Sequence, residues 1–488
     1  MYKVYRIHPS IGIARIGNSR TSFFDGPAVP DIHFLPPDGN FRDGGYIRRQ
    51  AVRFYVFEFD YEDELLSHLA SVRRLTAADA DISWTVHLAN TKSFTYVNGV
   101  KTPIPNNPGP KTVSGGDPPC DIVGHIFNTD VQLGTIEAID DATLRVLGGF
   151  GESGPPATPH AGGLHWPDWY DDVGDGPVKA SIRLKIDGTS PPVDSAWVVT
   201  GVPKFATPIE PIVTMYDVAY DIAIRYRGFQ RPKEVSFSRD ILPVLRRAVM
   251  FQWVEERARS GHGTGRGGDF LTPDSLAQLS DPSENARAKR EDFFRRLKNP
   301  AGGGGDMPKL KGPPAPETPK TNGLSLTSFQ YECFEKWRNG NFIVNDWDGL
   351  IFPKTIPLDD LAPELQPEAL DRACLDTGIG GTYGPGIEVG MRFGEEASFG
   401  LPFRINESKL PGFLTSTLSI PWQVDYSACR EGWWPSARPN SVMIADGNYD
   451  EWARSALGDN MLTEWWKLAF IKKQLENGII TYRETERM

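Results

Sequence analysis

Cysteine is scarce in this chain, with four residues among 488. They lie far apart, at Cys120, Cys333, Cys374 and Cys429, and form no Cys-x-x-Cys pair. This distribution argues against a disulfide scaffold or a zinc ribbon. A free cysteine is most often a small buried apolar residue, and we expect that role for the first three. Cys429 needs a separate argument, because reactive side chains surround it in the sequence.

Patterns that bind metal ions are also missing. The eight histidines include no His-Glu-x-x-His motif, and the one closely spaced pair, His160 and His165, would need ligands from elsewhere in the chain. The acidic segment 169–176 is too short for the spaced oxygen ligands of a helix-loop-helix calcium site. We expect a hydrogen-bonded turn there, because Asp and Gly favour turns. The sequence therefore predicts no metal site.

Basic clusters and long apolar runs are absent as well. The chain has 52 Lys and Arg against 63 Asp and Glu, a net charge of -11, which argues against a nucleic-acid partner. No stretch reaches the roughly 18 apolar residues that span a bilayer, so we expect no membrane partner. Residues 1–10 lack the apolar segment and cleavage site of a secretory signal, and we expect a cytoplasmic location.

Glycine and proline, by contrast, are plentiful, at 49 and 41 residues, and indicate many tight turns. Alternating or continuous apolar patterns predict strands at 53–59, 143–147, 179–186 and 196–200. Apolar residues at helical spacing predict helices at 238–250, 326–337 and 448–476. Strands and helices do not alternate regularly. The sequence thus predicts an α+β fold, a β-rich mixed architecture with long loops and a helical C-terminal part.

Two Gly- and Pro-rich segments, 261–268 and 299–320, show no apolar period. The first contains Gly-x-Gly-x-x-Gly but follows a charged, helix-like stretch, so we interpret it as a flexible loop and expect no NAD or flavin on this chain. The second suggests a division of the chain. We expect a β-rich N-terminal region with a middle helix at 1–300, a flexible segment at 301–325 and a C-terminal region at 326–488.

The C-terminal region contains an unusual group of reactive side chains. Asp425 lies four residues before Cys429, and three indoles, Trp422, Trp433 and Trp434, flank the thiol. An accessible, activated sulfur beside an aromatic ring is suited to oxidative chemistry. A buried structural cysteine is the other interpretation that these residues allow.

Several ordered segments resemble one enzyme family, that of the cysteine tryptophylquinone-dependent amino acid oxidases, whose members include a lysine ε-oxidase and a glycine oxidase. The resemblance extends from residue 7 to about residue 471. The matching segments are 7–19, 45–54, 84–90, 171–178, 216–221, 384–388 and 434–439.

The resemblance implies a cofactor made from the protein's own side chains. In that family a Cys sulfur is bonded to a Trp ring whose indole is oxygenated to an ortho-quinone. The Cys position matches Cys429, and the Asp four residues earlier matches Asp425. In the family, the modified indole comes shortly before a Leu-Gly-Phe-like step. This pattern matches Trp465, which two residues separate from Leu468. Trp466 is the second candidate and Trp452 the third. The helical C-terminal part would then bear the cofactor.

The resemblance also implies an activity, namely oxidation of an amino acid or another primary amine. A quinone carbonyl can form a Schiff base with an amine, and Asp425 could then remove the carbon-bound proton. The products would be a carbonyl compound, ammonia and hydrogen peroxide, with oxygen as electron acceptor. Tyr383 and Glu388 are further candidates for lining the substrate pocket. The family implies a flavoprotein partner that helps to mature the cofactor, and a homo-oligomer.

Two departures from the family leave the substrate open. Gly378 stands where relatives often carry Cys, and Ala469 replaces Gly in the Leu-Gly-Phe step. Two other functions remain as alternatives. One is a non-catalytic binding protein on the same scaffold with unmodified Cys429, since fold does not fix function. The other is a quinone enzyme that acts on a peptide- or carrier-bound amine.

Overall fold

The computed structural model of the protein describes residues 2–155, 165–310, 323–381, 386–428, 434–445, 447–452, 460–476 and 478–488. Its largest element is a 13-stranded sheet formed by residues 2–201. The strands of this sheet are β1 (Tyr2–His8), β2 (Ile11–Arg15), β3 (Phe23–Asp25), β6 (Arg49–Tyr61), β7 (Leu69–Arg74), β8 (Ala80–Val86), β11 (Lys111–Ser114), β12 (Cys120–Ile126), β13 (Thr129–Ile139), β14 (Thr143–Gly148), β17 (Gly174–Leu184), β18 (Val193–Asp194) and β19 (Ala196–Gly201).

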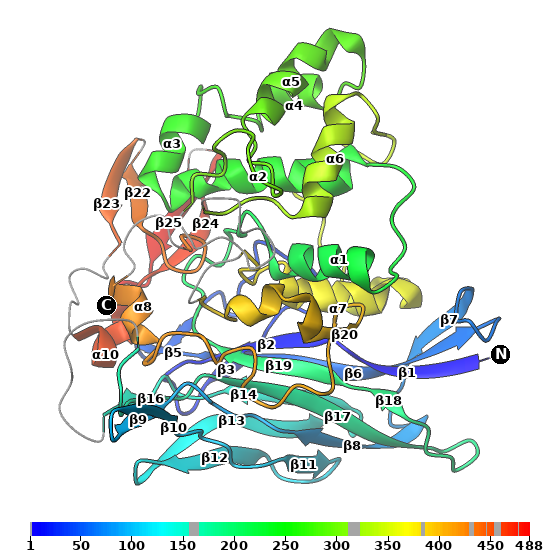
Figure 1. Ribbon diagram of the computed structural model, residues 1–488, viewed down its shortest axis with the longest axis vertical. Helices are drawn as coiled ribbons and strands as arrows, with labels where there is room; N and C mark the ends of the chain where they lie inside the picture. The colour runs from blue at the N-terminus through cyan, green and yellow to red at the C-terminus, as the bar shows by residue number, and fades with distance from the viewer. Residues whose placement is uncertain are drawn as a thin grey trace.

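The strands of this sheet follow the order β11-β8-β17-β19-β2-β6-β14-β13-β12. Most neighbours are antiparallel, but β19 runs parallel to β2. At the far ends of the order, β11 lies beside β12 and β13, so the sheet curls back towards itself (Figure 1). The long strand β6 also pairs with β1, β3 and β7, and its Phe54 and Phe57 are fully buried. These aromatic rings place β6 in the interior of the molecule.

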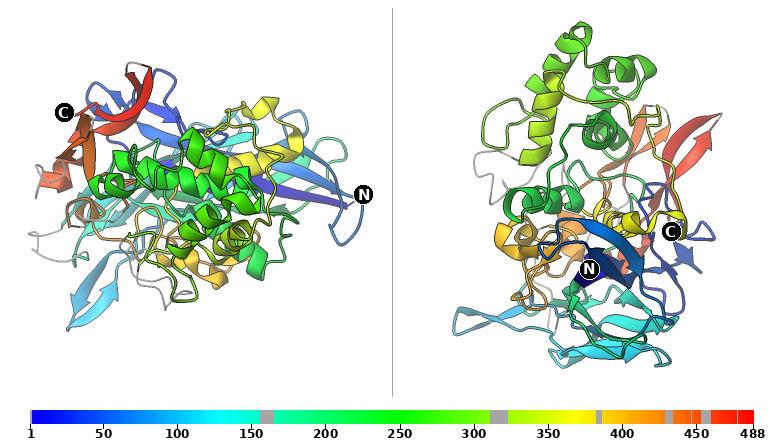
Figure 2. Two further views of the ribbon diagram at one scale, coloured as in Figure 1. Left: turned by 90° about the horizontal axis from the view of Figure 1, so that it is seen from above. Right: turned by 90° about the vertical axis from the view of Figure 1, so that its right-hand side faces the viewer.

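Helices cover one face of this sheet in two tiers, as the right-hand view of Figure 2 shows. In Figure 1, α1 and α7 lie next to the sheet, and α2 to α6 lie farther out. A capping box at Thr214 and Asp217 begins α1, because each side chain accepts a hydrogen bond from the other's backbone N–H. The helices are α1 (Met215–Tyr226), α2 (Leu242–Met250), α3 (Glu256–His262), α4 (Pro273–Leu279), α5 (Arg287–Arg295), α6 (Ser328–Arg338) and α7 (Gln366–Leu375).

Short hairpins and helices make up the remainder of the described chain. At one edge of the sheet, α8 (Gln423–Ala428) and α10 (Met461–Glu464) lie side by side, close to two C-terminal hairpins (Figure 1). The paired strands are β4 (Arg42–Asp43) with β5 (Tyr46–Ile47), β9 (Phe94–Val97) with β10 (Val100–Pro103), β15 (Ser153–Gly154) with β16 (Tyr170–Asp171), β20 (Phe399–Leu401) with β21 (Arg404–Ile405), β22 (Ser441–Ala445) with β23 (Asn448–Glu451), and β24 (Phe470–Glu476) with β25 (Ile479–Thr485).

Most of the predicted elements are confirmed. The predicted β-rich α+β architecture is present, and the four predicted strands lie in β6, β14, β17 and β19. The helix predicted at 326–337 is α6, and the one predicted at 238–250 is a π-turn (Phe237–Ile241) followed by α2. Among the described residues, every helix is too short or too polar to cross a membrane.

The long helix predicted at 448–476 is wrong. Its described residues form β23, the short helix α10 and β24 instead. The four consecutive residues Leu468–Ile471 are all buried, whereas a surface helix would bury only one stripe of its side chains. The expected boundary at 301–325 stays a prediction, and residues 311–322 of it lie outside the described part of the chain.

Candidate active site

Three of the residues predicted from the sequence lie where α8 meets α10. Asp425 is on α8 and is 3% exposed. Trp465 and Trp466 begin the 3-10 turn Trp465–Lys467, which directly follows α10. Because α8 contacts α10, the two chain segments are adjacent. Cys429, the residue after the last one of α8, lies outside the described residues.

The indole of Trp465 is enclosed by backbone and by a second indole. Its side chain is 2% exposed, and its Nε1 donates a hydrogen bond to the carbonyl of Gly151 at 3.2 Å. The same carbonyl accepts a hydrogen bond from Gln423 Nε2 of α8 at 3.1 Å. The ring of Trp422 meets that of Trp465 edge-on, with centroids 5.2 Å apart. These contacts fix the plane of the Trp465 ring.

Trp466, the second candidate for the cofactor, has different surroundings. Its Nε1 donates a hydrogen bond to the carbonyl of Thr463, on the preceding helix α10, at 3.0 Å. Its ring lies 6.2 Å from that of Tyr46, which is 54% exposed, and the Lys467 ammonium lies 5.6 Å from its centroid. Trp466 is therefore half-buried, partly packed against the hydrophobic core and less enclosed than Trp465.

Trp452, the third candidate, is fully buried in another aromatic group. Its Nε1 donates to the carbonyl of Ala469 at 3.1 Å, and its ring meets Phe205 edge-on at 5.2 Å. Its ring centroid is 6.3 Å from that of Tyr426 on α8. The hydroxyl of Tyr426 in turn donates to the carbonyl of Pro203 at 2.7 Å. Trp452 thus packs beneath α8.

Asp171 and Asp172, from the acidic segment 169–176, have buried carboxylates that bind backbone near Trp465. Asp171 accepts hydrogen bonds from Lys92 Nζ at 2.6 Å and from the N–H of Trp422 at 2.9 Å. Asp172 accepts them from the N–H groups of Gly151 at 2.6 Å and Glu152 at 3.1 Å. Both side chains therefore position segments that enclose the candidate cofactor.

The same segment was expected to be a local hydrogen-bonded turn, and this is only partly right. Asp175 lies within β17 and binds backbone N–H groups far along the chain, at Leu414 (3.0 Å) and Thr415 (2.9 Å). The hydrogen bonds are present, but their donors are mostly distant. Sequence reasoning missed the role of these aspartates and of Gly151. The glycine-rich run 148–151 was the available signal, since glycine in such a place often marks a close backbone approach.

Burial changes the ionisation of two of these aspartates. Removal from water, together with the smaller effects of the charges of Asp171 and Glu152, raises the pKa of Asp172 from 3.8 to about 7, while two backbone hydrogen bonds oppose the rise. Burial also raises the pKa of Asp175. Asp172 therefore changes charge near neutral pH.

Glu388, predicted to line the substrate pocket, is fully buried in an ion pair. Its Oε1 lies 3.3 Å from both terminal nitrogens of Arg15, and its Oε2 accepts from the N–H of Ile379 at 3.2 Å. Arg15 also donates to the carbonyl of Val202 at 2.9 Å. A role in the substrate pocket stays a prediction for Glu388, and Tyr383 lies outside the described residues.

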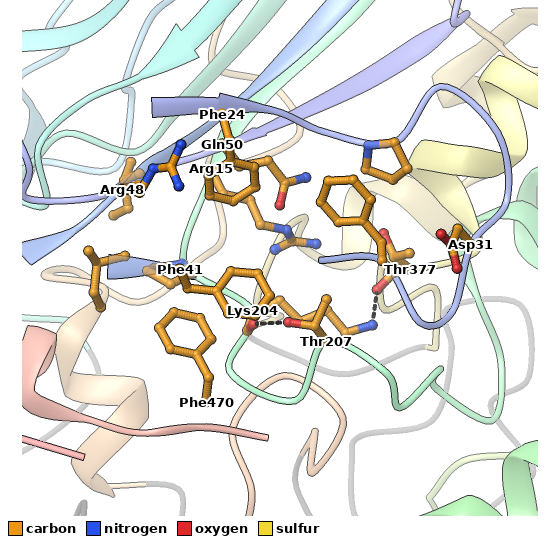
Figure 3. Close-up of a pocket in the computed structure, with 15 residues that line it drawn as sticks. Arg15, Phe24, Asp31, Phe41, Arg48, Gln50, Lys204, Thr207, Thr377 and Phe470 are labelled. Carbon is orange, nitrogen blue, oxygen red and sulfur yellow. Dashed lines mark hydrogen bonds between the residues drawn. The ribbon is translucent and has the colours of Figure 1, made fainter. Parts of the chain in front are cut away.

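A small pocket with a volume of about 30 Å³ lies beside this ion pair and is partly open to solvent. Figure 3 shows its aromatic wall, formed by Phe24, Phe41 and Phe470. At its base, Lys204 is 5% exposed and donates to the carbonyl of Thr377 at 2.9 Å. Burial, together with the charge of Arg15, lowers the pKa of Lys204 to about 7.

The chain is similar in sequence and in structure to known proteins. One family model, described as L-lysine epsilon oxidase N-terminal, matches residues 8–108 and 98–200. A second, described as the L-lysine epsilon oxidase C-terminal domain, matches residues 304–453. An L-lysine 6-oxidase from Marinomonas mediterranea is 26% identical in sequence. The match covers 87% of this chain and 70% of that protein.

Solved structures of the same relative share the fold. The crystal structure of the L-Lys epsilon-oxidase from Marinomonas mediterranea matches with a TM-score of 0.78 and 22% identity, and covers 99% of this chain and 95% of that one. A structure of the Schiff base intermediate of that oxidase with L-Lys matches with a TM-score of 0.76 over the same shares. The α+β architecture described above is therefore that of the solved oxidase.

Proposed function

The chain belongs to the L-lysine epsilon-oxidase family, and from this premise we propose that it oxidises an amino acid or another primary amine. We further propose that its cofactor is a cysteine tryptophylquinone formed from Cys429 and Trp465. Such a group supplies an electrophilic carbonyl that takes up two electrons from the amine carbon. The products would be a carbonyl compound and ammonia, and oxygen would be reduced to hydrogen peroxide.

The observation that carries the proposal is the packing of α8 against α10. It places the segment that ends at residue 428 beside the turn that begins with Trp465. The buried ring, held by the Gly151 carbonyl and by Trp422, is suited to a group that must keep one orientation. Trp466 is only half-buried, and its indole N–H bonds within its own segment, which supports Trp465 as the modified indole.

Asp425 is a buried carboxylate on α8, the helix that packs against α10. Its N–H donates to the carbonyl of Trp422 at 3.1 Å, so it lies one helical turn from the indole that touches Trp465. It is buried, and a general base in a site shielded from water does not compete with bulk solvent for the proton. We propose that Asp425 removes the proton from the amine-bearing carbon and also assists formation of the cofactor.

A peptide map tests the proposed cofactor. The chain would be expressed together with the flavoprotein that we expect to mature it, digested with trypsin and analysed by mass spectrometry. We expect the peptides that contain Cys429 and Trp465 to be joined covalently, and the intact protein to absorb visible light. Two unmodified linear peptides from the co-expressed protein would refute the proposal and favour a non-catalytic binding protein.

The substrate class is tested separately by peroxide release. A panel of free amino acids, simple primary amines and lysine-containing peptides would be offered to the matured protein. Release with free amino acids supports the proposed activity. Release with the peptides alone would instead favour a peptide- or carrier-bound amine as substrate.

A further inference from the structure

One peptide group connects a buried carboxyl group to the Trp465 indole. This is the amide between Gly151 and Glu152. Its N–H donates to Asp172 Oδ2 at 3.1 Å, and its carbonyl accepts from Trp465 Nε1 at 3.2 Å. The N–H of Gly151 donates to the same Asp172 oxygen at 2.6 Å. Asp172 and Trp465 thus lie at opposite ends of a short chain of hydrogen bonds.

The local backbone is built for this arrangement. Gly151 has a φ of +78°, which favours glycine, and a Cβ at this position would lie 2.0 Å from the Trp465 ring. A Cβ at Gly149 would lie 2.4 Å from Asp172 Oδ2. Glycine at both positions therefore allows the backbone to approach the carboxyl group on one side and the indole on the other.

The surroundings of Asp172 leave its charge sensitive to pH. Its carboxyl group is buried, and the carboxylates that face it are Asp171 and Glu152, with the hydroxyl of Tyr170 also close enough to interact. The cations near this segment have other partners: Lys92 is paired with Asp171, Arg20 is paired with Glu152, and Arg49 donates to the carbonyl of Gly148. With a pKa of about 7, Asp172 is present in both charge states at neutral pH.

We propose that Asp172 is a positioning residue whose charge state sets the strength of the hydrogen bond between the Gly151 carbonyl and the Trp465 indole. An ionised carboxylate polarises the amide that donates to it and makes the carbonyl of that amide a stronger acceptor, because hydrogen bonds in a chain reinforce one another. The inference deepens the proposed function, on which its importance for catalysis rests. If Trp465 carries the quinone, Asp172 adjusts the electron density of that ring from a distance.

The test is a pH titration of the Trp465 indole N–H signal by ¹⁵N NMR, with the signal assigned by its loss in Trp465→Phe. The protein would be produced without the maturation flavoprotein, so that the indole is unmodified. In the wild type we expect the signal to move downfield as the pH rises, with a midpoint near the pKa of Asp172, about 7. Asp172→Asn keeps an acceptor oxygen but no charge, and should abolish the shift.

Asp175→Asn is the matched control, because Asp175 is equally buried in the same segment but binds Leu414 and Thr415. It should retain the shift. A wild-type signal that does not move between pH 5 and 9, or a shift that persists in Asp172→Asn, would overturn the inference. If Asp172→Asn does not fold, the wild-type titration decides alone. The result is independent of the peptide map, so failure of the inference and failure of the proposed cofactor are distinguishable.

Discussion

At the scale of single residues, the candidate site depends on contacts rather than on residue type. Three indoles compete for one role, and only Trp465 combines burial with a hydrogen bond to Gly151 and contact with the Trp422 ring. The family resemblance gave Trp465 as the first candidate, Trp466 as the second and Trp452 as the third. The sequence could not separate neighbouring indoles on physical grounds, because adjacent positions in a turn differ only in the direction of their side chains.

Substitution of each indole should therefore have different results. In Trp465→Phe we expect loss of both the visible absorption and the joined peptides, because phenylalanine offers no indole to modify. Trp466→Phe, which changes a half-buried ring, should retain both. Absorption spectra and peptide maps of the co-expressed variants provide the measurement. The reverse result would assign the cofactor to Trp466.

Asp425→Asn should reduce amine oxidation at least about 100-fold, since a positioned general base typically contributes a factor of about 100 to 10,000. The change keeps the size of the buried side chain and removes its ability to accept a proton. Peroxide release measures the loss, and a peptide map shows whether the cofactor still forms. Asp450→Asn, at an exposed position on β23, is the control and should be fully active. Normal turnover in Asp425→Asn would remove Asp425 from the mechanism.

At the scale of elements, the site is held by segments that the chain brings together from afar. The buried pair between Lys92 and Asp171 connects the loop after β8 to the residue before α8, through the N–H of Trp422. Lys92 also donates to the carbonyl of Ser419 at 3.1 Å. A buried charge that loses its partner is costly, so this pair is important for placing α8.

Lys92→Met should lower the free energy of unfolding by about 3–5 kcal/mol, the typical cost of leaving one member of a buried pair alone. Urea denaturation followed by fluorescence gives the measurement. The matched surface variant Arg287→Met breaks the exposed pair with Glu291 and should cost less than about 1 kcal/mol. Equal losses in the two variants would show that the buried pair has no special role.

The elements also show which features a sequence can reveal. Strands such as β6 and β14 were predictable because their apolar residues follow a local pattern. The predicted helix at 448–476 was wrong because the burial of Leu468–Ile471 depends on contacts with distant segments, such as the bond from the Ile471 N–H to the Phe205 carbonyl at 2.8 Å. The roles of Asp171 and Asp172 were hidden for the same reason. Their partners are remote in sequence.

At the scale of the whole molecule, hydrogen bonds and ion pairs to Glu58 join three strands of the large sheet, β1, β6 and β7. This buried carboxylate of β6 accepts hydrogen bonds from Lys3 Nζ and the Tyr5 hydroxyl on β1, both at 2.7 Å, and from Arg73 Nε on β7 at 2.8 Å. Burial alone would raise the pKa of Glu58, but hydrogen bonds from Arg73, Lys3 and Tyr5 outweigh it and lower the pKa from 4.5 to about 2.

Because the pKa of Glu58 is lowered, we expect the free energy of unfolding to decrease at low pH. The unfolded chain binds a proton at Glu58 near pH 4.5, whereas the folded chain resists it down to about pH 2. The contribution of Glu58 is therefore complete above pH 4.5 and is lost as the pH falls through that window. Glu58→Gln should cost about 1–2 kcal/mol at pH 7, a figure reduced for the solvent around Lys3 and Arg73, and clearly less at pH 2, where about half of the folded molecules carry a protonated Glu58. Urea denaturation across this range, with exposed Asp81→Asn as control, would check it.

The contact between Trp465 and Gly151 also has a consequence for the order of events during synthesis. The two residues are 314 positions apart, and Arg42 donates to the carbonyl of Leu468 from even earlier in the chain. The ribosome therefore completes the platform for the indole long before the indole itself emerges. Any bond between residues 429 and 465 can form only after both have been synthesised, when the whole N-terminal sheet has also been made. We therefore expect a maturation enzyme to act on the nearly complete chain rather than on a short nascent peptide.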